Sequence, residues 1–431
     1  MEHLILALPL IGMIILIAIG MPVAFAMGVA GAIGIFFMGG FGSLMGILGT
    51  SPYRTAASYT LTTVPLFILM AQLIVKSEIV HDIFEAGYKW LGHLPGGVAI
   101  ATVMADAGFG AMCGSSTAAA AAMSSVAIPQ MKRLKYKDSL SGGVVAVAGT
   151  LAIMIPPSIV FIIYGSVTET SIGKLLIAGI IPGIMTALAY AVAIYLWVKI
   201  DPSVSPSQQA WSWKEKVSSL KGVWPMFVLF IVVIGTIYMG VATPTESAAF
   251  GATVALIMGL AMRRLDKDRI FAACLATIQS TVMIFVLIIG AMIFGYYITM
   301  TQLPQNFVKL IAASSIDRWV IMGGLVLFYI LLGCILDQIA ILLLTLPITF
   351  PLIMSLGFDP IWFGVMITAL AEIGLITPPV GLNCFIVSQV SKLPLEEVFK
   401  GTSILLISEV VIIVLLMCFP EITLWLPSMM N

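Results

Sequence analysis

Two proline pairs, Pro156-Pro157 and Pro378-Pro379, interrupt apolar segments of this 431-residue chain. Proline lacks a backbone N–H and clashes with the preceding turn, so a helix must break at each pair. The carbonyls freed at such a break suit a hard cation such as Na⁺, and the amino end of the next half-helix suits a carboxylate. Within a bilayer, unpaired backbone groups are tolerated only where they are buried in protein or face a polar cavity. The proline pairs therefore predict ion and anion binding at buried helix breaks.

A polar interruption of a second apolar segment precedes each proline pair. The first is Cys113-Gly-Ser-Ser-Thr117 and the second is Gly333-Cys-Ile-Leu-Asp-Gln338. Their side chains add hydroxyl and carboxylate oxygens, and a carboxylate flanked by apolar runs, such as Asp337, is a functional-site candidate. Two alternatives stay open, because Gly-Ser-Ser-Thr could be a small-residue packing patch and Pro-Pro a simple kink. Asp106 and Glu372 have similar apolar surroundings and could be either functional or paired structurally.

The sequence partly matches itself after a shift of 222 residues. Pro129 then falls on Pro351, Pro156-Pro157 on Pro378-Pro379, and Ser166 on Ser388. Each proline pair follows the end of a segment that contains one of the polar interruptions. We therefore predict two copies of one unit, a hairpin followed by a broken helix.

Composition places these units in a membrane. The chain is 61% hydrophobic and 9% charged, with a mean hydropathy of +1.14. Runs such as residues 4–19, 223–240 and 271–294 reach or approach the ~20 apolar residues that span a bilayer. Zero net charge gives no indication of nucleic acid binding, and the five cysteines show no CxxC spacing that would indicate a metal site. No GxxxxGK[ST] phosphate loop occurs in the sequence.

Basic residues predict the orientation, because Lys and Arg concentrate in cytoplasmic loops. Five loop groups carry 16 of the 20 Lys and Arg residues, and the other four are Arg54, Lys174, Lys309 and Arg318. With the five groups in the cytoplasm, both termini are periplasmic and about ten crossings accompany two segments that return to their starting side. The first returning segment opens from the cytoplasm and the second from the periplasm, so the repeats are inverted, as in many secondary transporters.

We therefore predict an all-α polytopic membrane protein with an inverted repeat, two re-entrant helical hairpins and two broken helices. Hairpin arms of ~14–17 residues give roughly 21–26 Å of helix, short of a ~30 Å crossing. The predicted divisions are N-terminal spans in 1–95, the first hairpin and broken helix in 96–168, central spans in 169–300, the second hairpin and broken helix in 301–391, and a C-terminal span in 392–431.

Four motifs in order resemble the large membrane subunit of tripartite ATP-independent periplasmic (TRAP) transporters. They are Gly114-Ser-Ser-Thr-Ala-Ala-Ala-Ala, residues 151–158, the segment 240–251, and Glu372-Ile-Gly-Leu-Ile-Thr-Pro-Pro-Val-Gly-Leu-Asn383. The resemblance covers essentially the whole chain. It implies an elevator-type importer of carboxylate-bearing solutes in the bacterial inner membrane, driven by a Na⁺ gradient and surrounded by membrane lipid. It also implies two partners, a small four-span membrane subunit, expected here as a separate chain, and a periplasmic substrate-binding protein.

The resemblance and the helix-break argument together suggest the site residues. Na⁺ is expected near Ser115, Ser116, Gly149, Ile153 and Pro156, and a pseudo-symmetric cation near Asp337, Gly374 and Thr377. The substrate is expected between the hairpin tips and the proline pairs, near Thr117, Ser158, Pro379 and Asn383. The segment 240–251 has a structural explanation, because Thr243 or Thr245 can cap the helix that follows, with Glu246 near its positive end.

Three other functions stay open. A carboxylate symporter without a binding protein would have the same architecture. An intramembrane enzyme would need a catalytic pair such as Asp106 and Asp337, but no nucleophile or metal-ligand constellation accompanies them. A scaffold subunit would not need paired polar hairpins.

Overall fold

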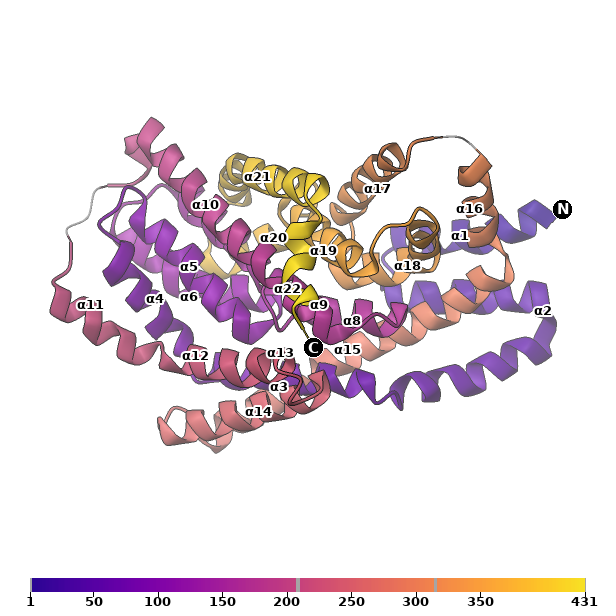
Figure 1. Ribbon diagram of the computed structural model, residues 1–431, viewed down its shortest axis with the longest axis horizontal. Helices are drawn as coiled ribbons and strands as arrows, with labels where there is room; N and C mark the ends of the chain where they lie inside the picture. Colours follow the sequence, from indigo (N-terminus) through magenta and orange to yellow (C-terminus); the bar gives the residue numbers. More distant parts are fainter. Residues whose placement is uncertain (1, 207–209, 314–315, 431) are drawn as a thin grey trace.

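The computed structural model describes residues 2–206, 210–313 and 316–430, and every regular element within those ranges is helical (Figure 1). Helices are expected because a segment in lipid must satisfy its own backbone N–H and C=O groups. Seven helical segments of the described chain are long and apolar enough to cross a bilayer, or up to nine if two bent pairs each count as one. The predicted all-α polytopic class is confirmed.

The predicted repeat is present, and its helices coincide closely. Helices α6 and α18, and likewise α7 and α19, begin and end 222 residues apart. The first copy contains α4 (Ile79–Leu91), α5 (Gly97–Cys113), α6 (Ser116–Arg133), α7 (Asp138–Met154), α8 (Ile159–Thr168), α9 (Ile172–Ala178) and α10 (Ile180–Ile200). The second contains α16 (Leu303–Ala313), α17 (Arg318–Gly333), α18 (Gln338–Ser355), α19 (Pro360–Ile376), α20 (Leu382–Ser391) and α21 (Leu395–Cys418).

The repeat is longer than the sequence match indicated. Helices α4 and α16 also correspond, because Ile79–Leu91 shifted by 222 residues falls on 301–313 and overlaps Leu303–Ala313, although neither helix was predicted as an element. Helix α4 follows α3 (Thr63–Lys76) after a bend of 66°. Each hairpin is therefore preceded by a short helix of its own.

The two hairpins point toward each other. Hairpin 1 is α5 and α6, which lie on the left of Figure 1, and hairpin 2 is α17 and α18, which lie on the right. Their tips line one cavity, so the two copies are inverted as predicted. The arms contain 16 to 18 residues. At 1.5 Å per residue they are about 24–27 Å long, short of a full crossing.

Sequence determines where hairpin 1 turns. Gly114 ends α5 with φ 64°, a left-handed conformation that costs glycine little, and Ser115 then takes an extended conformation before α6 begins. In hairpin 2, residues 334–337 form the turn, and Asp337 caps α18 by accepting a hydrogen bond from Ala340 N at 2.8 Å. Both predicted polar interruptions are thus hairpin tips.

Both broken helices lie in the centre of the molecule. Break 1 is residues 155–158, between α7 and α8, and break 2 is residues 377–381, between α19 and α20. Every residue from Leu140 to Met154 and from Trp362 to Ile376 is buried. A helix that is apolar on all sides requires such burial, so α7 and α19 lie among other helices rather than in lipid. The bonds Pro156-Pro157 and Pro378-Pro379 are both cis.

Long outer helices cover one side of this centre. They are α1 (Glu2–Ala18), α2 (Val23–Ala56), α3, α14 (Pro244–Ala261) and α15 (Lys267–Met300), of which α2, α3, α14 and α15 follow the lower edge of Figure 1. Helix α2 has a break at Gly40, where φ is 72° and ψ is −178°. Of the two residues that the sequence offered as the cap of α14, Thr243 is the one that caps it. Thr245 instead contacts α3, with its Oγ1 2.7 Å from Thr63 Oγ1.

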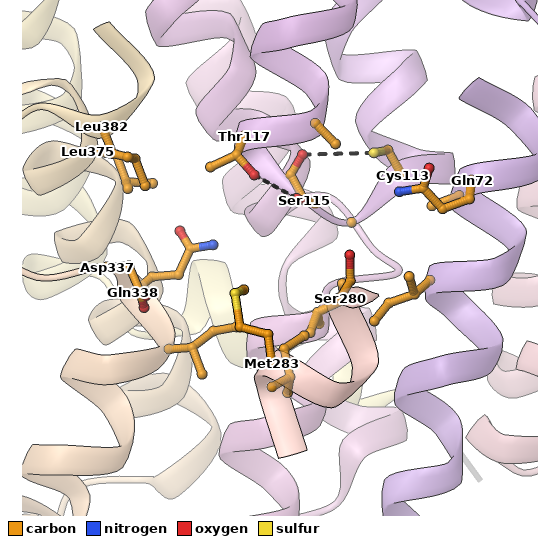
Figure 2. A pocket seen from close by; sticks show the side chains of 17 residues that line it. Gln72, Cys113, Ser115, Thr117, Ser280, Met283, Asp337, Gln338, Leu375 and Leu382 are labelled. Carbon is orange, nitrogen blue, oxygen red and sulfur yellow. Dashed lines mark hydrogen bonds between the residues drawn. The ribbon is translucent and has the colours of Figure 1, made fainter. Parts of the chain in front are cut away.

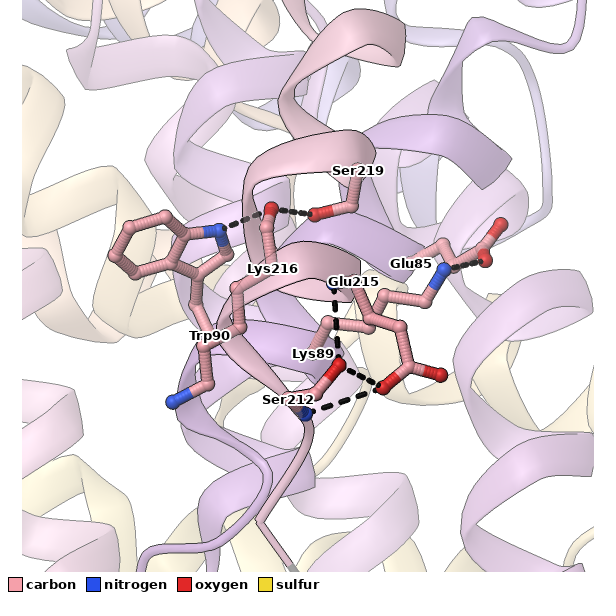
Figure 3. A network of polar contacts seen from close by, with 7 residues as sticks. All are labelled: Glu85, Lys89, Trp90, Ser212, Glu215, Lys216 and Ser219. Atoms are coloured by element: carbon pink, nitrogen blue, oxygen red, sulfur yellow. Dashed lines mark hydrogen bonds and ion pairs between the residues drawn. The ribbon is translucent and has the colours of Figure 1, made fainter.

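The segment between the repeats contains short elements. They are α11 (Trp213–Ser219), α12 (Trp224–Phe230), a π-helix (Ile231–Gly235) and α13 (Thr236–Tyr238), with 3₁₀ turns at Pro202–Val204 and Leu220–Gly222. Outside this segment, a 3₁₀ turn at Thr60–Thr62 precedes α3, and α22 (Glu421–Ser428) follows α21. Helix α11 begins with a capping box between Ser212 and Glu215 (Figure 3). Trp90 Nε1 on α4 donates to Lys216 O on α11 at 2.9 Å (Figure 3). This bond connects α11 to α4, the short helix that precedes hairpin 1.

Helix α21 packs against the broken helix α7 through glycines. A methyl group on Gly401 would lie 1.9 Å from Ser139 O and 2.8 Å from Gly143 Cα. Close approach of small residues is a common way for helices to pack in membranes. This contact fixes the amino-terminal part of α7, at the end of the helix away from break 1.

We expect Gly401→Ala to lower the melting temperature of the purified protein, because the added methyl must separate α21 from α7. Overpacking of this kind costs ~1–3 kcal/mol of the free energy of unfolding. The matched control is Gly323→Ala on α17, where a methyl meets no atom within 4 Å. Equal melting temperatures for the two variants would contradict the packing described here.

Candidate functional site

A cavity lies between the two hairpin tips (Figure 2). Its volume is about 340 Å³, within the range of sites that hold small organic molecules. Tip 1 contributes residues 113–115 and 117–118, and tip 2 contributes residues 337–339. Ile159, Leu375 and Leu382 line it beside the two breaks, and α3 and α15 close the remaining side. The cavity therefore brings together the four segments that the sequence predicted as one site.

The tip of hairpin 1 presents hydroxyl groups and the amino end of α6. Ser115 Oγ and Thr117 Oγ1 lie 3.2 Å apart, and both residues line the cavity. Ser115 is the N-cap residue of α6 but its side chain does not cap the helix. The first N–H groups of α6 are therefore left for other partners, which is the arrangement that attracts anions.

Ser116 lies behind this tip rather than in the cavity. It is fully buried, and its Oγ has no hydrogen-bond partner among the described residues. Buried polar side chains without a hydrogen-bond partner are uncommon in folded proteins. Ser116 thus carries a buried hydroxyl beside the hairpin tip, outside the cavity.

Backbone contacts join tip 1 to break 1. A methyl group on Gly114 would lie 2.4 Å from Pro157 O. A methyl on Gly149 would lie 3.1 Å from Ala120 N and 2.9 Å from Ala120 Cβ, so α6 and α7 also touch one turn further along. The segment that contains Gly149, Ile153 and Pro156 therefore packs directly against the tip that carries Ser115 and Ser116.

The second break makes an equivalent contact with tip 2. A methyl on Gly374 would lie 2.3 Å from Gly333 Cα, and Val380 N donates to Cys334 O at 3.3 Å. Thr377 Oγ1 donates to Ile373 O at 2.6 Å. Gly374 thus meets Gly333, and Val380, just past Thr377, meets Cys334.

Asp337 occupies a different place from these two residues. Its carboxylate caps α18 and lines the cavity, whereas Gly374 and Thr377 are not among the residues that line the cavity. The sequence argument selected Asp337 within residues 333–338 because it carries a charge, and it did not predict the close approach of Gly333 to Gly374. The signal that could have identified Gly333 was the glycine itself, since only glycines permit the approach to Gly374 seen here.

The other residues predicted to bind substrate lie around the cavity at different depths. Thr117 lines it. Ser158 is fully buried and caps α8, where its Oγ accepts from Phe161 N at 3.4 Å. Asn383 is fully buried and its Nδ2 donates to Ala146 O at 3.2 Å, which joins α20 to α7. Pro379 is exposed and, like Ser158 and Asn383, is not among the lining residues.

Buried carboxyl groups lie behind the site. Asp106, Glu372 and Glu409 are fully buried, and Tyr190 Oη donates to Glu409 Oε1. The sequence argument singled out Asp106 and Glu372 but missed Glu409, which is far from both along the chain. None of the three lines the cavity. Within the described ranges, no three His, Cys, Asp or Glu residues gather as a metal site would require.

The fold and the cavity define a polytopic membrane transporter. The inverted hairpins and helix breaks surround one small cavity that carries a few polar side chains among apolar ones, the arrangement found in many secondary transporters. The family model described as the tripartite ATP-independent periplasmic transporter, DctM component, matches residues 10–422. The chain therefore belongs to the large permease subunits of the TRAP transporter family, which are transporters rather than enzymes, and the resemblance seen in the sequence is confirmed.

Two relatives illustrate the range of the family. The chain is 35% identical to the C4-dicarboxylate TRAP transporter large permease protein DctM of Pseudomonas aeruginosa, over 87% of this chain and 88% of that protein. It is 31% identical to the sialic acid TRAP transporter large permease protein SiaM of Vibrio cholerae, over 86% and 87% of the two chains. The crystal structure of the Alcanivorax borkumensis YdaH transporter has a similar fold, with a TM-score of 0.54, 14% identity, and coverage of 86% of this chain and 88% of that one.

We expect Asn383→Leu to destabilise the protein, because the change removes the hydrogen bond from break 2 to α7. Loss of one such hydrogen bond costs ~0.5–1.5 kcal/mol of the free energy of unfolding. Thermal unfolding of the variant measures the effect, and Asn306→Leu on the exposed face of α16 is the control. An unchanged melting temperature for Asn383→Leu would show that this bond does not hold the break.

Proposed function

We propose that this chain imports a carboxylate-bearing solute across the bacterial inner membrane, coupled to a Na⁺ gradient. The observation that carries the proposal is the convergence of two inverted hairpin tips and two helix breaks around one cavity. Each break supplies carbonyls suited to a cation, and the free amino end of α6 suits a carboxylate. A carboxylate is stabilised in such a place when cations bind close by.

The first proposed Na⁺ site lies between tip 1 and break 1. Its ligands are drawn from Ser115, Ser116 and the carbonyls of Gly149, Ile153 and Pro156. The contact between Gly114 and Pro157, together with the unpartnered Oγ of Ser116, supports this choice. Oxygen ligands of this kind suit hard cations.

The second proposed Na⁺ site lies between tip 2 and break 2. The ligands expected from the sequence are Asp337, Gly374 and Thr377. We place the ion at Gly374 and Thr377, and the close approach of Gly333 supports adding its carbonyl. Asp337 faces the cavity beside this site, where its charge favours a cation near tip 2. The substrate occupies the cavity, in contact with Thr117 and close to Ser158, Pro379 and Asn383.

Transport then follows an elevator movement in which the hairpins and broken helices move against the outer helices. The proposed moving parts are residues 96–168 and 301–391, and the proposed support comes from 1–95, 169–300 and the C-terminal span 392–431. The cavity lies between these parts, since α3 and α15 form one wall and the hairpin tips form the other. When the hairpins move, a solute in the cavity would therefore lose its contacts with α3 and α15.

Two partners complete the proposed system. A small four-span membrane subunit joins the outer helices, and a periplasmic binding protein delivers the substrate. Membership of a tripartite family supports both. The charge distribution favours periplasmic termini, with α11 and the other Lys-rich segments in the cytoplasm.

Uptake into vesicles that contain the complete three-part system tests this function. We expect labelled solute to accumulate with an inward Na⁺ gradient and not with an equal K⁺ gradient. Ser115→Ala should raise the Na⁺ concentration for half-maximal uptake by about tenfold, the loss expected for one ligand. Ser125→Ala, on the exposed side of α6, should leave this concentration unchanged.

One result would contradict Na⁺ coupling, and another would contradict only the proposed positions of the ions. Uptake that is equal in Na⁺ and K⁺ would exclude Na⁺ coupling. Na⁺-dependent uptake that is unaffected by both Ser115→Ala and Gly374→Ala would retain the coupling but place the ions elsewhere.

A further inference from the structure

Three polar side chains face the cavity without a partner (Figure 2). Gln72 comes from α3, Ser280 from α15 and Gln338 from tip 2. None of the three makes a hydrogen bond to another described residue, and Gln338 Oε1 is buried. Ser115, Thr117 and Asp337 differ, because each already has a hydrogen bond within the protein. Gln72, Ser280 and Gln338 therefore have hydrogen-bonding capacity that only the contents of the cavity can use.

The chemistry of these groups restricts what can satisfy them. An amide presents both N–H donors and a carbonyl acceptor, and a serine hydroxyl also donates and accepts. A hydroxyl or N–H group on a ligand can complement both functions. A carboxylate only accepts, so it cannot donate to the amide oxygen of Gln72 or to the hydroxyl oxygen of Ser280, and an acceptor removed from water without a donor is unfavourable.

Charge restricts the ligand further. Among the described residues that line the cavity, Asp337 is the single charged side chain, and it is acidic. One carboxylate can be held at the amino end of α6 beside a bound cation. A second carboxylate, at the opposite wall, would face Asp337 and the amide acceptors instead of a basic group. A dicarboxylate is therefore poorly matched to this cavity.

The three residues are divided between the two walls of the cavity. Gln338 lies on a hairpin tip, whereas Gln72 and Ser280 lie on the outer helices α3 and α15 that pack together. A ligand held among all three bridges the hairpins and the outer helices.

We infer that Gln72, Ser280 and Gln338 select a monocarboxylate that carries hydroxyl or N–H groups, such as a sugar acid, over a dicarboxylate. This inference rests on the proposed function, because it assumes that the cavity holds the transported solute. Its carboxylate lies at tip 1, and its hydroxyl or N–H groups contact the two amides and the serine. Selection at this cavity follows from hydrogen-bond matching rather than from a basic side chain.

Ligand-dependent thermal stabilisation tests the inference. The full chain, purified with its small membrane subunit in nanodiscs, is heated in Na⁺ or K⁺ with gluconate, succinate or no solute, and unfolding is followed by tryptophan fluorescence. We expect Na⁺ alone to raise the melting temperature, and gluconate in Na⁺ to raise it further than succinate does. In Gln338→Met, the gluconate concentration for half-maximal stabilisation should rise about tenfold while the Na⁺ effect is retained.

Gln389→Met, at an exposed position of α20, is the matched control and should bind gluconate as the unaltered chain does. Ser280→Ala and Gln72→Met should weaken gluconate binding in the same direction. A gluconate shift that is no larger than the succinate shift, or that survives Gln338→Met, would overturn the inference while the Na⁺ effect leaves the proposed function standing. Loss of the Na⁺ effect in the unaltered chain would contradict the proposed function itself.

Discussion

The structure depends on one constraint, that backbone groups freed at a helix break inside a membrane must find partners. Proline pairs make the breaks unavoidable, and lipid offers nothing to the carbonyls they release. The molecule meets this constraint by placing each break under a hairpin tip and each broken helix at the centre. Glycines at 114, 149, 333 and 374 permit the close approach, and the burial of α7 and α19 excludes lipid.

The same constraint explains why the site is made largely of backbone and small polar side chains. A basic side chain buried inside the membrane would be costly, whereas helix ends provide partial charges without that cost. The cavity has no basic side chain along its described lining, and its hydrogen-bonding side chains come from four separate elements. Binding in such a site depends on geometry, so a helix shift of a few tenths of an ångström would alter it.

Much of this could be predicted from the sequence because the relevant signals are local. Pro-Pro, Gly-Ser-Ser-Thr and Leu-Asp-Gln each determine where a helix ends, and the structure places both hairpin tips and both breaks there. The contact between Gly333 and Gly374 could not be predicted, since it depends on how α17 and α19 pack. Gln72, Ser280 and Glu409 were missed for the same reason, since a single polar residue in an apolar helix gives no indication of what it faces. Helices α4 and α16 were missed because short amphipathic helices between spans have low overall hydrophobicity.

The correspondence of α4 with α16, added to that of the hairpins, makes each half of the chain a complete structural unit with a tip and a break. The shared cavity, however, requires one unit of each orientation. An ancestral single-unit protein could have built this cavity only as an antiparallel pair, with identical chains inserted into the membrane in both directions. Joining two copies in one chain fixes their opposite orientations, and from then on the two tips are free to differ, with serines on one and an aspartate and a glutamine on the other.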